Sequence, residues 1–226
     1  PLIRIHERWR ADTPLVGRED ELEVLTAGIR KIWAGEHPGA VIVSGEAGIG
    51  KSRLVAEVAR RAGEAGARVL IGRADAVEQS TPYFAWRSVI ASAIGFSAGD
   101  SPDQVRARVD EYMLALPRLE RLTPLLSTVL PIQLSDNEVT QQLAGGARAE
   151  NTDRILLAIL ERSADTGPVA LVVDDAHWLD SASWRLLSQV IGSIRPPLTL
   201  LVVRSEAPTA SGEFERLAES AQTRVL

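Results

Sequence analysis

The chain of 226 residues contains no cysteine, which excludes a disulfide framework and any cysteine-based zinc site or nucleophile. An apolar run long enough for a membrane helix is also absent, so we expect a cytoplasmic protein with no membrane partner. Excess positive charge is lacking as well. Because the net charge is −5, we expect no direct nucleic-acid binding by this region.

What the chain does contain is a stretch at residues 41–52 (VIVSGEAGIGKS), in which a strand-like run leads into a complete phosphate-loop pattern at 45–52, followed by a helical stretch at 53–61. Glycines allow backbone N–H groups to point at a phosphate, and the helix adds the positive end of its dipole. Lys51 can reach the β- and γ-phosphates in a catalytic role, and the Ser52 hydroxyl can bind Mg²⁺. The residues predicted to hold ATP or ADP here are Gly45, Glu46, Ala47, Gly48, Ile49, Gly50, Lys51, Ser52 and Arg53.

A second apolar run, residues 168–175 (PVALVVDD), ends in two carboxylates. An unalternated run is typical of a strand covered on both faces of a parallel sheet, and ligands bind at the carboxyl ends of such strands. Successive side chains point to opposite faces, so one carboxylate should face the phosphate loop. We assign Asp174 to Mg²⁺ and Asp175 to the attacking water. We interpret His177 as a packed or surface residue.

A third apolar run, residues 198–204 (LTLLVVR), predicts a strand that ends at Arg204. If this strand lies between the first and third strands, Arg204 points at the γ-phosphate and can sense whether that phosphate is present. The acidic pair and Arg204 together favour slow hydrolysis of ATP to ADP and phosphate.

The alternation of apolar runs with helical patterns predicts an α/β fold with a parallel, helix-covered sheet. We expect strands from about residue 40, at 68–72, 168–175, 198–204 and 223–226, and helices at 19–33, 53–61, from 80, from 101, at 119–130, from a cap at 151–153, at 182–191 and at 214–221, with a loop at 135–147. Residues 73–168 far exceed the roughly dozen residues of a simple crossover, so we interpret them as a largely helical insertion between the second and third strands. An ATPase core at 14–226 would follow an N-terminal strand or linker at 1–13, and the chain is interpreted as a fragment.

Five stretches, taken together, carry a family resemblance: 13–22 (TPLVGREDEL), 43–54 (VSGEAGIGKSRL), 81–87 (TPYFAWR), 171–183 (LVVDDAHWLDSAS) and 200–206 (LLVVRSE). In this combination the chain resembles the STAND branch of P-loop ATPases, close to the AAA superfamily. The resemblance is strongest to the ATPase modules of proteins with class III adenylyl or guanylyl cyclase domains and of large LuxR-type transcription regulators.

The resemblance implies a P-loop NTPase fold with strand order 5-1-4-3-2, in which Arg204 lies beside the phosphate loop as a first sensor. It implies that Val16, Gly17 and Arg18 lie at the adenine end of the nucleotide. It also implies a regulatory switch that works with other domains of the same polypeptide, either a cyclase or helix-turn-helix output with helical repeats, and that can form a homo-oligomer. Members of this family usually continue into a C-terminal lid, which we expect to be absent from this fragment.

Other readings remain open. A nucleotide-gated interaction module with negligible turnover, a small-molecule kinase and a scaffold that binds no nucleotide all fit parts of the pattern. A GTPase is disfavoured because no N-K-x-D guanine box is present. A transporter ATPase is disfavoured because residues 143–147 (LAGGA) lack the serine and glutamine of that family's signature.

Overall fold

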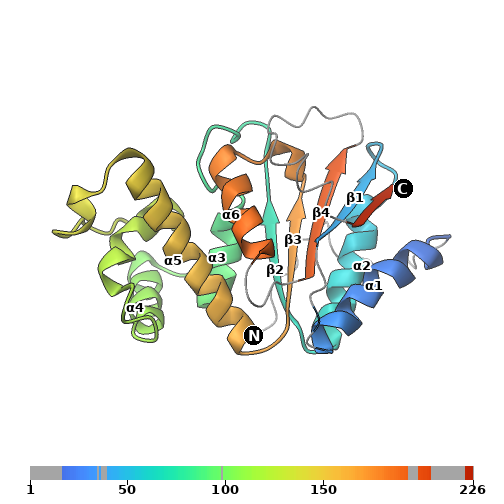
Figure 1. Cartoon of the computed structure of the whole chain (residues 1–226), viewed down its shortest axis with the longest axis horizontal. Coiled ribbons are helices and arrows are strands. Elements are labelled where there is room, and N and C mark those ends of the chain that lie inside the picture. The colour runs from blue at the N-terminus through green and yellow to red at the C-terminus, as the bar shows by residue number, and fades with distance from the viewer. Residues whose placement is uncertain are drawn as a thin grey trace.

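A parallel five-stranded sheet with the order β2-β3-β4-β1-β5 forms the centre of the computed structural model, which describes residues 17–34, 36, 40–97, 99–192, 198–204 and 222–225 (Figure 1). The strands are β1 (Ala40–Gly45), β2 (Arg68–Arg73), β3 (Val169–Asp174), β4 (Leu198–Arg204) and β5 (Gln222–Val225). The predicted fold class and strand order are therefore confirmed. The N-terminal segment 1–13, Val16 and the expected helix at 214–221 lie outside the described residues.

Helices cover both faces of this sheet (Figure 1). They are α1 (Glu19–Trp33), α2 (Lys51–Glu64), α3 (Trp86–Ile94), α4 (Pro102–Met113), α5 (Gly145–Asp165) and α6 (Ser181–Ile191), with 3-10 helices η2 (Glu120–Thr128), η3 (Thr140–Gln142) and η4 (Ala176–Trp178). In β3, Ala170 and Val172 pack with α1 and α2, whereas Leu171 and Val173 pack with α3, α5 and α6. The unalternated run of β3 is thus explained by burial on both faces.

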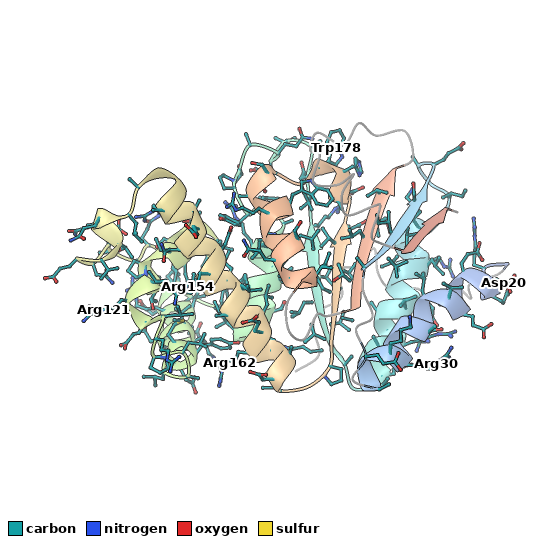
Figure 2. The ribbon with its side chains drawn as sticks, in the orientation of Figure 1. Asp20, Arg30, Arg121, Arg154, Arg162 and Trp178 are labelled. Carbon is teal, nitrogen blue, oxygen red and sulfur yellow. The ribbon has the colours of Figure 1, made fainter. Side chains whose placement is uncertain are left out.

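The segment between β2 and β3 is helical and extends away from the sheet, with α4 on the left side of Figure 1. In Figure 2, Arg121 and Arg154 mark this end of the molecule. The start of α4 follows the prediction, since Ser101 caps it in a reciprocal capping box with Gln104. None of the described helices is long and apolar enough to cross a membrane.

The N-terminus of α5 differs from the prediction. We expected a loop at 135–147 and a cap at 151–153, but α5 begins at Gly145 and contains all three expected capping residues in its interior. There, Asn151 Nδ2 donates to the carbonyl of Ala147 and Thr152 Oγ1 to that of Arg148, each 2.8 Å away. Such bonds to a carbonyl four residues back are compatible with a continuous helix. Asp153, the third expected capping residue, is buried.

Two further helix predictions need correction. The helix expected from residue 80 begins only at Trp86, because Tyr83 has a φ of 60° and this left-handed conformation cannot be part of an α-helix. The helix expected at 119–130 is a 3-10 helix over residues 120–128, and it contains Pro124, which has no backbone N–H to donate.

Gly72 allows the close approach of β2 to the turn that precedes α3. A Cβ atom at this position would lie only 2.6 Å from the carbonyl oxygen of Ala85 and 3.0 Å from Val89. The Ser88 hydroxyl donates to the carbonyl of the adjacent Ile71, 2.7 Å away. A side chain at Gly72 would therefore push α3 away from the sheet.

Candidate functional site

The phosphate loop connects β1 directly to α2 at the carboxyl edge of the sheet. Gly48 and Gly50 have φ values of 81° and 99°, in the left-handed region that glycine adopts without strain. Gly50 is the N-cap of α2, and residues 46–50 are exposed. This conformation presents the loop backbone and the N-terminus of α2 to an incoming anion.

Lys51 is folded back along the loop. Its side chain is buried, and Nζ donates to the carbonyls of Gly45 at 2.8 Å and Glu46 at 2.6 Å. The ammonium group therefore lies under the start of the loop, where it adds positive charge to the site predicted for the phosphates.

Asp174, the last residue of β3, meets the start of α2. Ser52 Oγ donates to Asp174 Oδ1 at 3.3 Å, across 122 residues of sequence, and the N–H of Asp175 donates to the same oxygen at 3.1 Å. Burial raises the pKa of the Asp174 carboxyl, the charge of Asp175 raises it further, and Arg73 opposes the shift. A hydroxyl beside a buried carboxylate suits Mg²⁺, which takes oxygen ligands and whose charge would offset the cost of burying Asp174.

Asp175 leaves the strand with a φ of 52° and turns toward β2. Its Oδ2 lies 3.5 Å from Nη2 of Arg73, and both side chains are partly exposed. Arg73 is the last residue of β2 and is paired with Asp174 in the strand ladder. We did not predict Arg73 as a site residue, although it ends a strand in the same way as Arg204 does.

The predicted adenine box is close to the phosphate loop where it is described. Arg18 Nη2 donates to the carbonyl of Ile49 at 3.4 Å, and Arg18 Nη1 pairs with Glu21 at 2.9 Å. Gly17 is exposed beside it, and Val16 lies outside the described residues. The contact with Ile49 joins the start of α1 to the loop, 31 residues away in sequence.

The remaining predicted residues lie near the same edge. β4 is located between β1 and β3, and Arg204 pairs with Gly45 in the ladder, whereas the Arg204 side chain lies outside the described part of the structure. Arg53 is half-buried in the first turn of α2. His177 is buried in η4, with its ring centroid 4.8 Å from that of Trp178. Figure 2 shows Trp178 at the edge where the strands end.

Among solved structures, the chain is similar to the Aeropyrum pernix ORC1 protein in complex with DNA. The TM-score is 0.55 at 19% identity, over 98% of this chain and 47% of that one. A likeness at this identity supports the fold alone.

Curated relatives are much longer than this chain. It is 28% identical over 214 residues to the uncharacterized protein R02095 of Rhizobium meliloti (strain 1021), which covers 92% of this chain and 20% of that protein. It is also similar to adenylate cyclase type 10 of Oryctolagus cuniculus, at 18% identity over 80% of this chain and 11% of the cyclase. The human adenylate cyclase type 10 is 17% identical over 88% of this chain and 12% of the cyclase.

One family model covers most of the chain. The model described as AAA ATPase domain matches residues 14–203, a range that includes the phosphate loop, the acidic pair and all but the last residue of β4. The chain therefore belongs to the AAA ATPase domain family.

Proposed function

We propose that this chain is the ATP-binding and ATP-hydrolysing switch module of a larger signalling protein of the STAND type. The observation that carries the proposal is the 3.3 Å contact between Ser52 and Asp174, because it joins the phosphate loop to the acidic strand. Each half alone is compatible with simple anion binding. Together they make a site for a nucleotide with its metal.

Each residue has a distinct role in this proposal. Lys51 and the N–H groups of the loop hold the phosphates, and Ser52 with Asp174 holds Mg²⁺, which when bound neutralises phosphate charge. Asp175 orients the attacking water, and Arg204 senses the γ-phosphate. The adenine lies toward Val16, Gly17 and Arg18.

The larger context comes from the relatives. Because the chain spans only about a fifth or less of their length, we propose that it acts with further domains of the same polypeptide in the cytoplasm. The two matches to adenylate cyclase type 10 support a cyclase-associated role, with a helix-turn-helix output and helical repeats as the other predicted partners. Homo-oligomerisation and the lack of direct nucleic-acid binding stay predictions.

A second function, a nucleotide-gated interaction module with negligible turnover, is favoured by one contact. Arg73 holds the carboxylate of Asp175 at 3.5 Å, so the residue proposed to orient water is already engaged. A site in this state can bind nucleotide and change conformation while it hydrolyses slowly.

Phosphate release under multiple turnover separates these two functions. We expect measurable release by the wild-type chain and a decrease of about tenfold or more in Asp175→Asn, which keeps the size of the side chain and loses its charge. Asp110→Asn, on the exposed face of α4, is the matched control and should release phosphate at the wild-type rate. Tight ATP binding with no release above a Lys51→Ala background would reject hydrolysis and leave the interaction module.

We expect Arg204→Ala to bind ADP normally and to lose about tenfold in ATP affinity, because only ATP carries the γ-phosphate that a sensor contacts. The measurement is a pair of calorimetric titrations, one with each nucleotide. Arg30→Ala is the control, since Arg30 lies near the amino ends of the strands, opposite the phosphate loop (Figure 2). Equal losses for ATP and ADP would remove the sensor role from Arg204.

A further inference from the structure

The connection between β2 and α3 contains a tyrosine in an unfavourable backbone conformation. Tyr83 has a φ of 60° and a side chain that is only 3% exposed. A left-handed conformation costs a residue other than glycine about 1 kcal/mol or more, and persists only where surrounding contacts impose it. Tyr83 belongs to the aromatic stretch 81–87, to which the sequence assigns no mechanism.

The contacts that hold Tyr83 form a polar cluster around the buried Asp153, which we call the Tyr83 cluster: Tyr83, Asp153, Arg185 and Gln189. Tyr83 Oη donates to Asp153 Oδ1 at 2.6 Å, and Arg185 Nη2 donates to Tyr83 Oη at 3.0 Å. Arg185 also pairs with Asp153, and Gln189 Nε2 donates to Asp153 Oδ2 at 3.4 Å. Asp153 is 2% exposed, and these donors offset the free-energy cost of burying its charge.

The cluster joins three elements that are distant in sequence. Asp153 lies on α5, Arg185 and Gln189 lie on α6, and Tyr83 lies in the turn before α3. Figure 1 shows α3, α5 and α6 together on one side of the sheet. The cluster therefore fixes α6 to the helical segment between β2 and β3.

The start of α6 is bound to the same turn and leads straight back to the acidic pair. Trp86 Nε1 donates to the carbonyl of Ser183 at 3.3 Å, and the N–H of Ser183 donates to the capping carboxylate of Asp180 at 2.9 Å. Only four residues separate Asp180 from Asp175, and three of these four form η4. A shift of the first turn of α6 would move this short link and Asp175 with it.

The other end of the same connection touches the acidic pair directly. The N–H of Ala74 donates to the carbonyl of Asp174 at 3.0 Å, and Arg73 lies 3.5 Å from the Asp175 carboxylate. Residues 73–86 thus contact the acidic segment at Asp174 and Asp175, and contact α6 at Ser183 and Arg185. The segment from the end of β3 to the start of α6 is held from both sides.

We propose that Tyr83, Asp153 and Arg185 are positioning residues for the acidic pair: they set the entry of α6, and with it the placement of Asp174 and Asp175. The consequence is that the helical segment between β2 and β3 controls how strongly Mg²⁺ increases the affinity for ATP. This consequence rests on the proposed function. Nucleotide contacts made by the phosphate loop do not depend on this cluster.

The test uses the two tyrosines of the chain, Tyr83 and Tyr112. Both donate to residues of α5, since Tyr112 Oη donates to the carbonyl of Ile159 at 3.0 Å, but none of the described contacts of Tyr112 reaches α6. Tyr83→Phe and Tyr112→Phe therefore each remove a phenolic hydroxyl that donates to α5, and of these two hydroxyls the one on Tyr83 also accepts from Arg185 of α6. Each variant is measured for ATP affinity with Mg²⁺, for ATP affinity with EDTA, and for hydrogen exchange of the backbone amides over 175–185.

For Tyr83→Phe we expect the gain in affinity due to Mg²⁺ to fall about fivefold, the affinity in EDTA to stay within about twofold, and exchange over 175–185 to accelerate about tenfold. Tyr112→Phe should leave all three within about twofold of wild type. An unchanged gain from Mg²⁺ in Tyr83→Phe, or a parallel loss of both affinities, would overturn the proposal.

Failure of the proposed function can be distinguished in the same experiment. If the wild-type chain binds no nucleotide in either condition, the proposed function is wrong. The hydrogen-exchange measurement then decides whether the Tyr83 cluster controls the acidic segment. Faster exchange over 175–185 in Tyr83→Phe alone would support the link between the cluster and the acidic segment. Unchanged exchange there would reject it.

Discussion

Replacement of Lys51 by alanine should weaken the binding of Mg·ATP by about 100-fold or more, because phosphate charge would then lie in the loop without its principal cation. The side chain is buried and already turned toward the loop, with Nζ on the carbonyls of Gly45 and Glu46. It needs only to exchange carbonyl contacts for phosphate contacts. We expect this variant to fold, since alanine is a good residue for the first turn of α2.

The chain contains only one other lysine, Lys31, which makes a matched control available. Lys31 lies in the last turn of α1, so Lys31→Ala changes the net charge by the same amount without touching the loop. Titration calorimetry of both variants measures the difference. Similar affinities for Lys51→Ala and Lys31→Ala would contradict the placement of the phosphates.

Asp174→Asn should have opposite effects on stability and on the use of Mg²⁺. Asp174 is 6% exposed and the pKa of its carboxyl is raised chiefly by burial, so the ionised form weakens the native state. Asparagine keeps an oxygen that can accept from Ser52 and from the N–H of Asp175, but carries no charge. We expect the Tm of the nucleotide-free protein to rise on the order of 2–4 °C, as for about 1 kcal/mol in a domain of this size. Mg²⁺-dependent turnover should fall about 100-fold.

The stability gain of Asp174→Asn should depend on pH in a defined direction. A raised native pKa means that the folded protein takes up the proton at a higher pH than the unfolded chain does. The free-energy cost of the ionised carboxylate is therefore complete above the raised pKa, decreases as pH falls through it, and vanishes below the unfolded pKa of about 3.9. Thermal unfolding at several pH values, with Asp110→Asn as control, measures it. A Tm difference that grows toward acidic pH would contradict this account of Asp174.

Local patterns were sufficient to predict the sheet and the phosphate loop. Apolar runs at 41–43 and 169–173 are contiguous in sequence and form strands wherever helices cover both faces, so their existence and relative order follow from the sequence and the family resemblance. The helix starts predicted near residues 101 and 182 are likewise local, because the side chains of Ser101 and Asp180 each accept from a backbone N–H three residues ahead.

The features that the sequence did not predict depend on distant contacts. Tyr83 interrupts an expected helix because it contacts Asp153, 70 residues away. The sequence predicts Asp153 as part of a helix cap, whereas in the structure it pairs with Arg185 on α6. Arg73 becomes part of the site only because β2 lies beside β3. Neither pairing leaves a pattern in a single sequence, since each joins polar residues through tertiary packing.

Calorimetric titration of ATP into the wild-type chain, with Mg²⁺ and then with EDTA, tests the central claim most directly. The contact between Ser52 and Asp174 predicts saturable binding of one nucleotide per chain, with an affinity at least about tenfold higher when Mg²⁺ is present. Lys51→Ala should lose this binding in both conditions. Absence of saturable binding, or an affinity that is equal with and without Mg²⁺, would contradict the assignment of the phosphate loop and the acidic strand to a single nucleotide site.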